Sequence, residues 1–189
     1  IALTFSTIAP VLPAIGKHFG SDTGSTFFAQ WIMTAPALGL MLGGALSGFL
    51  IDKIGPRFLI ITALCLFALG GSAGLYLDDP VAMLFSRFLL GLGGSSAATT
   101  ATWLVGERFD ELARRKLIGI QDACAGIAAM SALLLSGMLG AHIGWRMPFA
   151  IYLVAVPIAL LACLSVPRIK TASTREDSAT TGTMFSALW

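Results

Sequence analysis

Charge is scarce in this sequence. Charged residues make up 12% of its 189 residues, about half of the share that is usual in soluble domains. A soluble domain needs a charged and polar surface, so this shortage argues against one. The formal net charge of +2 also provides no basic field for nucleic acid. We therefore expect no nucleic-acid partner.

Other residue types that carry chemistry are also rare or missing. Asparagine is absent, so the sequence offers no acceptor for N-glycosylation. The three cysteines, Cys65, Cys124 and Cys163, fall in different apolar segments without metal-ligand spacing. No phosphate-binding loop, zinc motif or nucleophile motif occurs. We therefore predict no metal, no cofactor and no enzymatic activity.

Apolar residues are abundant where charge is scarce. Hydrophobic residues make up 56% of the chain, and glycine adds another 21 residues. A lipid bilayer suits this composition, and within it only helices or closed barrels satisfy all backbone hydrogen bonds. The alternating strands that are typical of barrels are missing. The sequence thus predicts an all-α membrane protein in contact with the lipid bilayer.

Runs with few or no charges divide the chain into six predicted transmembrane helices. These are residues 1–16, 23–51, 58–77, 81–106, 117–145 and 147–167. The first run is shorter than the roughly 20 residues that a spanning helix needs, so we expect its start to be missing. We predict a six-helix bundle over residues 1–167, a linker over 168–183 and the start of a second half at 184–189.

Lysine and arginine gather on one side of these spans. The loops near residues 52–57, 107–116 and 168–175 hold most of the 12 basic residues, and only Lys17 and Arg146 fall on the other side. The positive-inside rule then places those loops, the linker and the amino terminus in the cytoplasm. We expect a multi-pass protein of the plasma membrane, which is the inner membrane in a bacterium.

Glycine pairs four residues apart predict close helix packing. They occur at Gly39 and Gly43, within residues 44–48, within residues 70–74 and within residues 140–144. Small residues at this spacing let two backbones approach closely in a membrane, where apolar surface alone does not drive association. Any glycine-rich membrane helix shows some such spacing, so a single pair carries little weight.

The turn after the second span has the pattern Gly-x-x-x-Asp-x-x-Gly-x-Arg, formed by Gly48, Asp52, Gly55 and Arg57. Gly48 lacks a Cβ, so a neighbouring helix can approach it, and Gly55 permits a turn conformation closed to other residues. Asp52 can meet an arginine or the positive amino-terminal end of another helix. We expect Arg57 to meet an acidic residue of the 107–110 segment across this face.

This turn resembles the signature loop of the major facilitator superfamily, although Pro56 stands where a basic residue is common. Further matches are the pattern Glu-x(6)-Arg from Glu107 to Arg114, Arg87-x-x-x-Gly91-x-Gly93, Gly144-Trp145-Arg146 and Pro10-x-x-Pro13. The resemblance covers essentially the whole chain. It implies the amino-terminal six-helix half, of three plus three helices, of a twelve-helix transporter, with the carboxy-terminal half missing.

The resemblance implies secondary active transport of a small solute by alternating access, coupled to protons. It also implies a gate at the cytoplasmic face whose charge pairs form in one conformation and break in another. The gate residues would be Gly48, Asp52, Gly55, Arg57, Glu107 and Arg114. The alternative is a solvated turn whose positive charges only set the topology. A membrane-embedded enzyme and a non-transporting, receptor-like relative remain alternative functions.

Two charged residues lie within predicted spans. Arg87 is roughly 9 Å deep if its helix starts near Val81, at about 1.5 Å per residue. The resemblance implies a role for it in substrate or proton coupling, and the alternative is a side chain that snorkels to the interface. Asp122 suits proton coupling, or pairs with a basic neighbour at the interface. Gln30 and Gln121 are candidates to line a cavity with Arg87.

Overall fold

The computed structural model describes residues 2–13, 15 and 22–165, and within them every regular element is a helix. The predicted linker over residues 168–183 and the second half from 184 lie outside this part of the chain. The elements are α1 (Ala2–Ser6), η1 (Ala9–Val11), α3 (Asp22–Ile54), α4 (Pro56–Ser72), η2 (Ala73–Leu75), α5 (Pro80–Arg108), α6 (Glu111–His142), η3 (Met147–Val154) and α7 (Ala155–Ser165).

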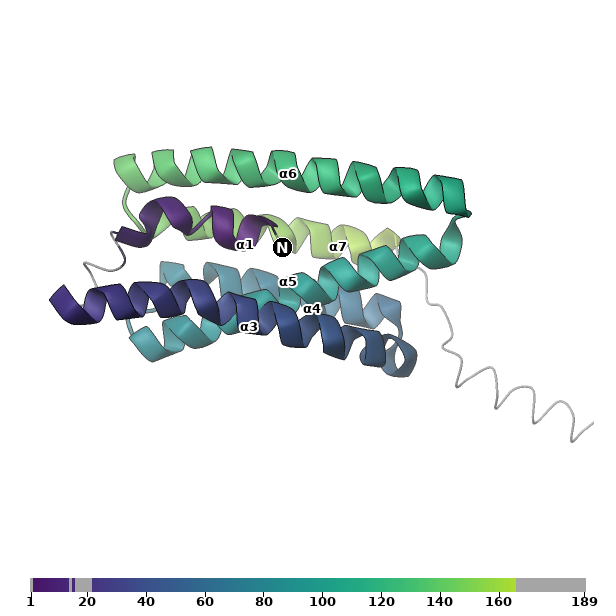
Figure 1. Ribbon diagram of the computed structural model, residues 1–189, viewed down its shortest axis with the longest axis horizontal. Coiled ribbons are helices and arrows are strands. Elements are labelled where there is room, and N and C mark those ends of the chain that lie inside the picture. The colour runs from purple at the N-terminus through teal and green to yellow at the C-terminus, as the bar shows by residue number, and fades with distance from the viewer. Residues whose placement is uncertain (1, 14, 16–21, 166–189) are drawn as a thin grey trace, which may run out of the picture.

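The long helices lie side by side along one axis, and α6 covers one side of the bundle (Figure 1). Five segments are long and apolar enough to cross a membrane, which confirms the all-α membrane fold and five of the predicted spans. They are Gln30–Ile54, Pro56–Leu75, Pro80–Arg108, Glu111–His142 and Met147–Leu164. The short elements α1 and η1 represent the predicted first span.

The loops predicted at residues 52–57 and 107–116 are mostly helical. Only Gly55 separates α3 from α4, and only Phe109 and Asp110 separate α5 from α6. Charged residues mark the end of an apolar stretch, but the helices continue through them, as α5 does to Arg108 and α6 does from Glu111. The prediction of an extended charged loop over 107–116 was therefore wrong.

Proline makes the first and last spans irregular. Pro10 has no N–H for the carbonyl of Ser6, where α1 ends, and Pro157 has none for the carbonyl of Leu153. Before Pro157 the chain is a 3-10 helix, and the N–H of Ala155 donates to the carbonyl of Tyr152. The predicted span over residues 147–167 is therefore helical as far as Ser165, and its first half is a 3-10 helix.

The gap between the predicted spans 58–77 and 81–106 is confirmed. Asp79 is the N-cap of α5, and its carboxylate accepts the N–H of Ala82 at 2.7 Å. Pro80 follows at the first helical position, where its missing N–H is of no consequence.

Close packing of α3 on α5 confirms one of the glycine pairs. A Cβ added at Gly39 would lie 2.1 Å from the carbonyl oxygen of Phe88, and one at Gly91 would lie 2.1 Å from that of Pro36. A Cβ added at Gly43 would lie 2.5 Å from the carbonyl oxygen of Leu92 and 2.3 Å from the side-chain oxygen of Ser95. The two backbones thus touch at a crossing that only glycine allows.

The buried core includes Ile8, which follows α1, and it also includes Phe67, Leu90, Phe149 and Tyr152 from α4, α5 and η3. In α6 only Ala132 and Ser136 are buried, so the first half of this helix, from Glu111, stands largely free of its neighbours. This leaves an open space between α5 and α6 near their connection.

Candidate functional site

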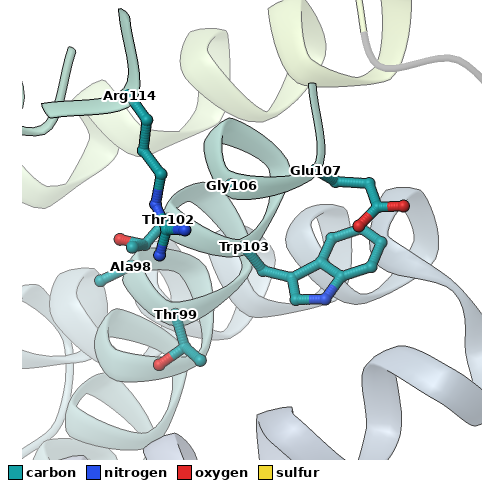
Figure 2. Close-up of a pocket in the computed structure, with 7 residues that line it drawn as sticks. All are labelled: Ala98, Thr99, Thr102, Trp103, Gly106, Glu107 and Arg114. Carbon is teal, nitrogen blue, oxygen red and sulfur yellow. The ribbon is translucent and has the colours of Figure 1, made fainter. Parts of the chain in front are cut away.

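A cavity of about 620 Å³ occupies the space below the α5–α6 connection (Figure 2). We call it the Arg114 cavity. Its lining residues are Ala98, Thr99, Thr102, Trp103, Gly106, Glu107 and Arg114. It lies at the end of the bundle where α3 and α5 end and α4 and α6 begin, which we call the charged end.

The local fold explains how these side chains converge. Thr99, Thr102, Trp103 and Gly106 have the i, i+3, i+4 and i+7 spacing of one helix face, so they share one side of α5. Arg114 comes from the first turn of α6, where its N–H donates to the carbonyl of Asp110 at 2.8 Å. The two-residue connection between the helices therefore holds this arginine over the face of α5.

Arg114 and Glu107 take different sides of the cavity. The guanidinium of Arg114 packs on Gly106, where an added Cβ would lie 3.5 Å from Cζ. Figure 2 shows it directed toward Thr102, whereas the carboxylate of Glu107 extends beside the indole ring of Trp103. Both side chains are exposed, and within the described residues neither forms an ion pair. The cavity therefore presents one positive and one negative group to a ligand.

Arg57 does not contact the acidic residues that the sequence predicted. Its Nη2 donates to the carbonyl oxygen of Cys163 at 2.7 Å and lies 3.9 Å from the Sγ of the same residue. Arg57 is the second residue of α4, which packs along α7, so it reaches the last turn of that helix. Carbonyls there lack donors within the helix, which makes an arginine a favourable cap.

The three other residues of the turn differ in their surroundings. Gly55 has a φ of 81°, which confirms the prediction of a conformation that favours glycine. Asp52 is exposed and forms no ion pair within the described residues. An added Cβ at Gly48 would meet nothing within 4 Å, so the expected close helix is not found within the described bundle. Gly39 and Gly43, earlier on α3, make that approach instead.

Arg87 is fully buried, with 0% of its surface exposed, so it does not snorkel to an interface. Its Nη2 donates to the carbonyl oxygens of Gly70 and Gly71, each at 3.1 Å. These carbonyls belong to the last turn of α4, whose negative dipole end favours a cation. Its Cζ lies 4.8 Å from the ring centroid of Phe149 and 5.8 Å from that of Tyr152.

Part of the Arg87 guanidinium lacks a hydrogen bond, since within the described residues its Nε and Nη1 have no hydrogen-bond partner. Two carbonyls and two aromatic rings therefore compensate the charge, because no carboxylate of the described residues pairs with it. A buried cation without a counter-ion is unfavourable, and in membranes such residues commonly have a functional role.

Comparison with known proteins decides the family. The sequence model of the Major Facilitator Superfamily matches residues 1–188. The chain belongs to the Major Facilitator Superfamily. It is 30% identical over 174 residues to the puromycin resistance protein pur8 of Streptomyces alboniger, which covers 89% of this chain and 33% of that protein.

Two further relatives carry names of transporters. The niacin transporter NiaP of Acinetobacter baylyi is 29% identical over 150 residues, covering 79% of this chain and 34% of that protein. The arabinose-proton symporter of Escherichia coli K12 is 24% identical over 164 residues, covering 87% of this chain and 34% of that protein. The chain thus spans about a third of the length of these relatives. Their names agree with the prediction that the chain is not an enzyme.

The remaining predicted residues of this Major Facilitator Superfamily chain do not gather around Arg87. Asp122 and Gln30 are exposed, and Gln121 is half-buried on α6. Neither Arg115 nor Lys116 forms an ion pair with Asp122. The cavity expected between the two glutamines and Arg87 is not found among the cavities described here, since the guanidinium is closed in by rings and backbone.

Thr99, Thr102 and Trp103, which were not predicted from the sequence, line the Arg114 cavity together with two predicted gate residues. The spacing of two hydroxyl groups and an indole on one helix face, near the end of an apolar span, could have identified them. The ion pair of Arg146 with Asp78, which joins the two connections at the opposite end of the bundle, was not predicted either. Arg146 additionally donates to the carbonyl of Leu75 there.

Proposed function

We propose that the protein is a secondary active transporter that moves a small solute by alternating access and couples it to protons. The observation that carries this proposal is the Arg114 cavity, where two residues of the predicted gate line one open space at the charged end. Family membership supports it, because relatives with transporter names include a proton symporter.

We propose that the charged end faces the cytoplasm of a bacterial inner membrane. The basic residues around 52–57 and 107–116 gather at this end, and Arg146 lies at the other. The positive-inside rule supports this orientation, with the amino terminus and the linker over 168–183 on the same side.

A second six-helix half would cover the free face of α3 in the complete transporter. Met41 is 72% exposed and Phe49 is 60% exposed on this helix, and Gly48 and Asp52 are open as well. Gly48 offers space for a helix of that half, and Asp52 offers a charge to its amino-terminal end. This arrangement accounts for gate residues that have no partner within the described part of the bundle.

Arg87 and Asp122 are the proposed coupling residues. The unpartnered Nε and Nη1 of Arg87 are supporting evidence, because they leave donors for a group that binds in another conformation. Asp122 is exposed on the open half of α6, so no neighbouring helix of the described bundle covers it. In this proposal the two residues act at separate places, since they do not pair in the structure.

Asp52→Asn is expected to lower gradient-driven uptake about tenfold, because a lost charge-assisted contact is worth about 1.4 kcal/mol. The measurement uses the full-length natural protein in proteoliposomes, with and without an inward proton gradient. The test solutes are niacin, riboflavin, arabinose and puromycin. Membrane insertion of the variant should stay normal.

Glu111→Gln is the matched control, because it removes one negative charge at the same end from an exposed pair with Arg115. Surface pairs of this kind contribute little, so its uptake should match the unmodified protein. Full uptake by Asp52→Asn would refute the gate. Failure of the proton gradient to drive any solute would refute coupled transport and favour a receptor-like relative.

A further inference from the structure

The hydroxyl groups in the Arg114 cavity are available to a ligand. Threonine in a helix commonly donates to the carbonyl four residues earlier, as Thr100 does to Ser96 and Thr34 does to Gln30. Within the described part of the chain, Thr99 and Thr102 make no such side-chain bond. Both line the cavity on the face of α5 below Arg114. Two donors therefore accompany the guanidinium.

Arg114 differs from its neighbour Arg115 in a way that points to a ligand. Arg115 pairs with Glu111 one turn earlier and projects from an exposed surface. Arg114 has no ion pair within the described residues, and its guanidinium lies on Gly106 at the cavity. A planar guanidinium with free N–H groups binds a carboxylate in a bidentate manner. The cavity thus has an anion-binding side.

The opposite side of the cavity determines the shape and the charge of the rest of the ligand. Trp103 provides a flat apolar surface, which suits an aromatic or otherwise planar body. Glu107 lines the cavity beside that ring and contributes a negative charge (Figure 2). It balances Arg114, so a ligand with two negative charges would meet about twice the repulsion from Glu107 that a monoanion meets.

We propose that the Arg114 cavity binds a small monocarboxylate with a planar apolar body, held by Arg114, Thr99 and Thr102 and stacked on Trp103. This inference rests on the proposed transport function, because the ligand would be the transported solute, bound in the cavity near the cytoplasmic side. It names a solute class, and it adds Thr99, Thr102 and Trp103 as binding residues beside Glu107 and Arg114, which the sequence assigned only to a gate.

Benzoate, benzamide and benzylammonium test this proposal, because they share one ring and differ in charge. Binding to the full-length protein in nanodiscs is followed by quenching of tryptophan fluorescence, and Trp103→Phe identifies the part of the signal that comes from the cavity. Benzoate is expected to bind at least about tenfold more tightly than benzamide, as a charge-assisted contact implies. Equal binding of the three compounds would overturn the proposal.

Arg114→Gln is expected to weaken benzoate binding about tenfold or more, whereas Arg115→Gln should leave it within about twofold. Both variants remove one exposed positive charge from adjacent positions of α6, so their difference isolates the cavity. Thr102→Val keeps the side-chain shape and should weaken binding severalfold. An equal effect of the two arginine variants would overturn the proposal, because a general field would then explain the binding.

Binding in nanodiscs and uptake in proteoliposomes together separate this inference from the proposed function. Specific benzoate binding without gradient-driven uptake of any solute would leave the site intact and refute transport. Gradient-driven uptake that Arg114→Gln leaves unchanged, with no saturable benzoate binding, would refute the site and leave transport intact.

Discussion

Gly39→Ala is expected to destabilise the bundle by about 3 kcal/mol, the upper part of the usual range for overpacking. The new methyl group would lie 2.1 Å from the carbonyl oxygen of Phe88 and 2.8 Å from the backbone nitrogen of Leu92. Neither backbone atom can move without shifting a whole helix. The measurement is the midpoint of thermal unfolding of the full-length protein in detergent.

Gly126→Ala provides the control for this prediction. An added Cβ at Gly126, within α6, would meet nothing within 4 Å, and alanine favours a helix more than glycine does. Its unfolding midpoint should equal or exceed that of the unmodified protein. If Gly39→Ala behaved in the same way, the close crossing of α3 and α5 would be wrong.

Arg87→Lys is expected to lower stability by about 2 kcal/mol despite keeping the charge. Both carbonyls accept from the terminal Nη2, which the shorter lysine side chain does not reach in place, and an ammonium has no planar face to pack under the ring of Phe149. The two carbonyls would lose a shared donor in the core of the bundle. Gradient-driven uptake should fall as well if Arg87 has the proposed coupling role.

Arg146→Lys is the matched control for Arg87→Lys. Arg146 lies at the same end of α5 but pairs with Asp78 at a partly exposed site, where an ion pair contributes little. Unfolding midpoints in detergent should therefore separate the two variants. Equal midpoints for Arg87→Lys and the unmodified protein would show that the buried contacts do not stabilise the bundle.

The spans were predictable because charged residues are costly in lipid, so runs without charge identify the spans in the sequence. The irregular segments were harder to predict. Gly55 could be placed in a special turn, since the next residue is proline and the pattern around it is distinctive. The extension of α5 and α6 through their charged residues could not be predicted, because charge indicates where an apolar span ends and does not indicate where the helix ends.

The contacts of the charged residues were the least predictable part. Arg57 and Arg87 both bind backbone carbonyls at helix ends, at Cys163 and at Gly70 and Gly71. Every residue has a backbone carbonyl, so the residue type does not indicate which carbonyl an arginine will bind. Sequence reasoning looks for a carboxylate instead, which is why it paired Arg57 with an acidic segment.

The most direct test of alternating access is the accessibility of the Arg114 cavity itself. Thr102→Cys places a thiol there in the full-length protein, with Cys65, Cys124 and Cys163 replaced by alanine. A membrane-impermeant maleimide is applied to inside-out and right-side-out vesicles. We predict labelling from the cytoplasmic side only, at a rate that an imposed proton gradient changes severalfold. Equal labelling from both sides, or a rate that the gradient leaves unchanged, would contradict the account.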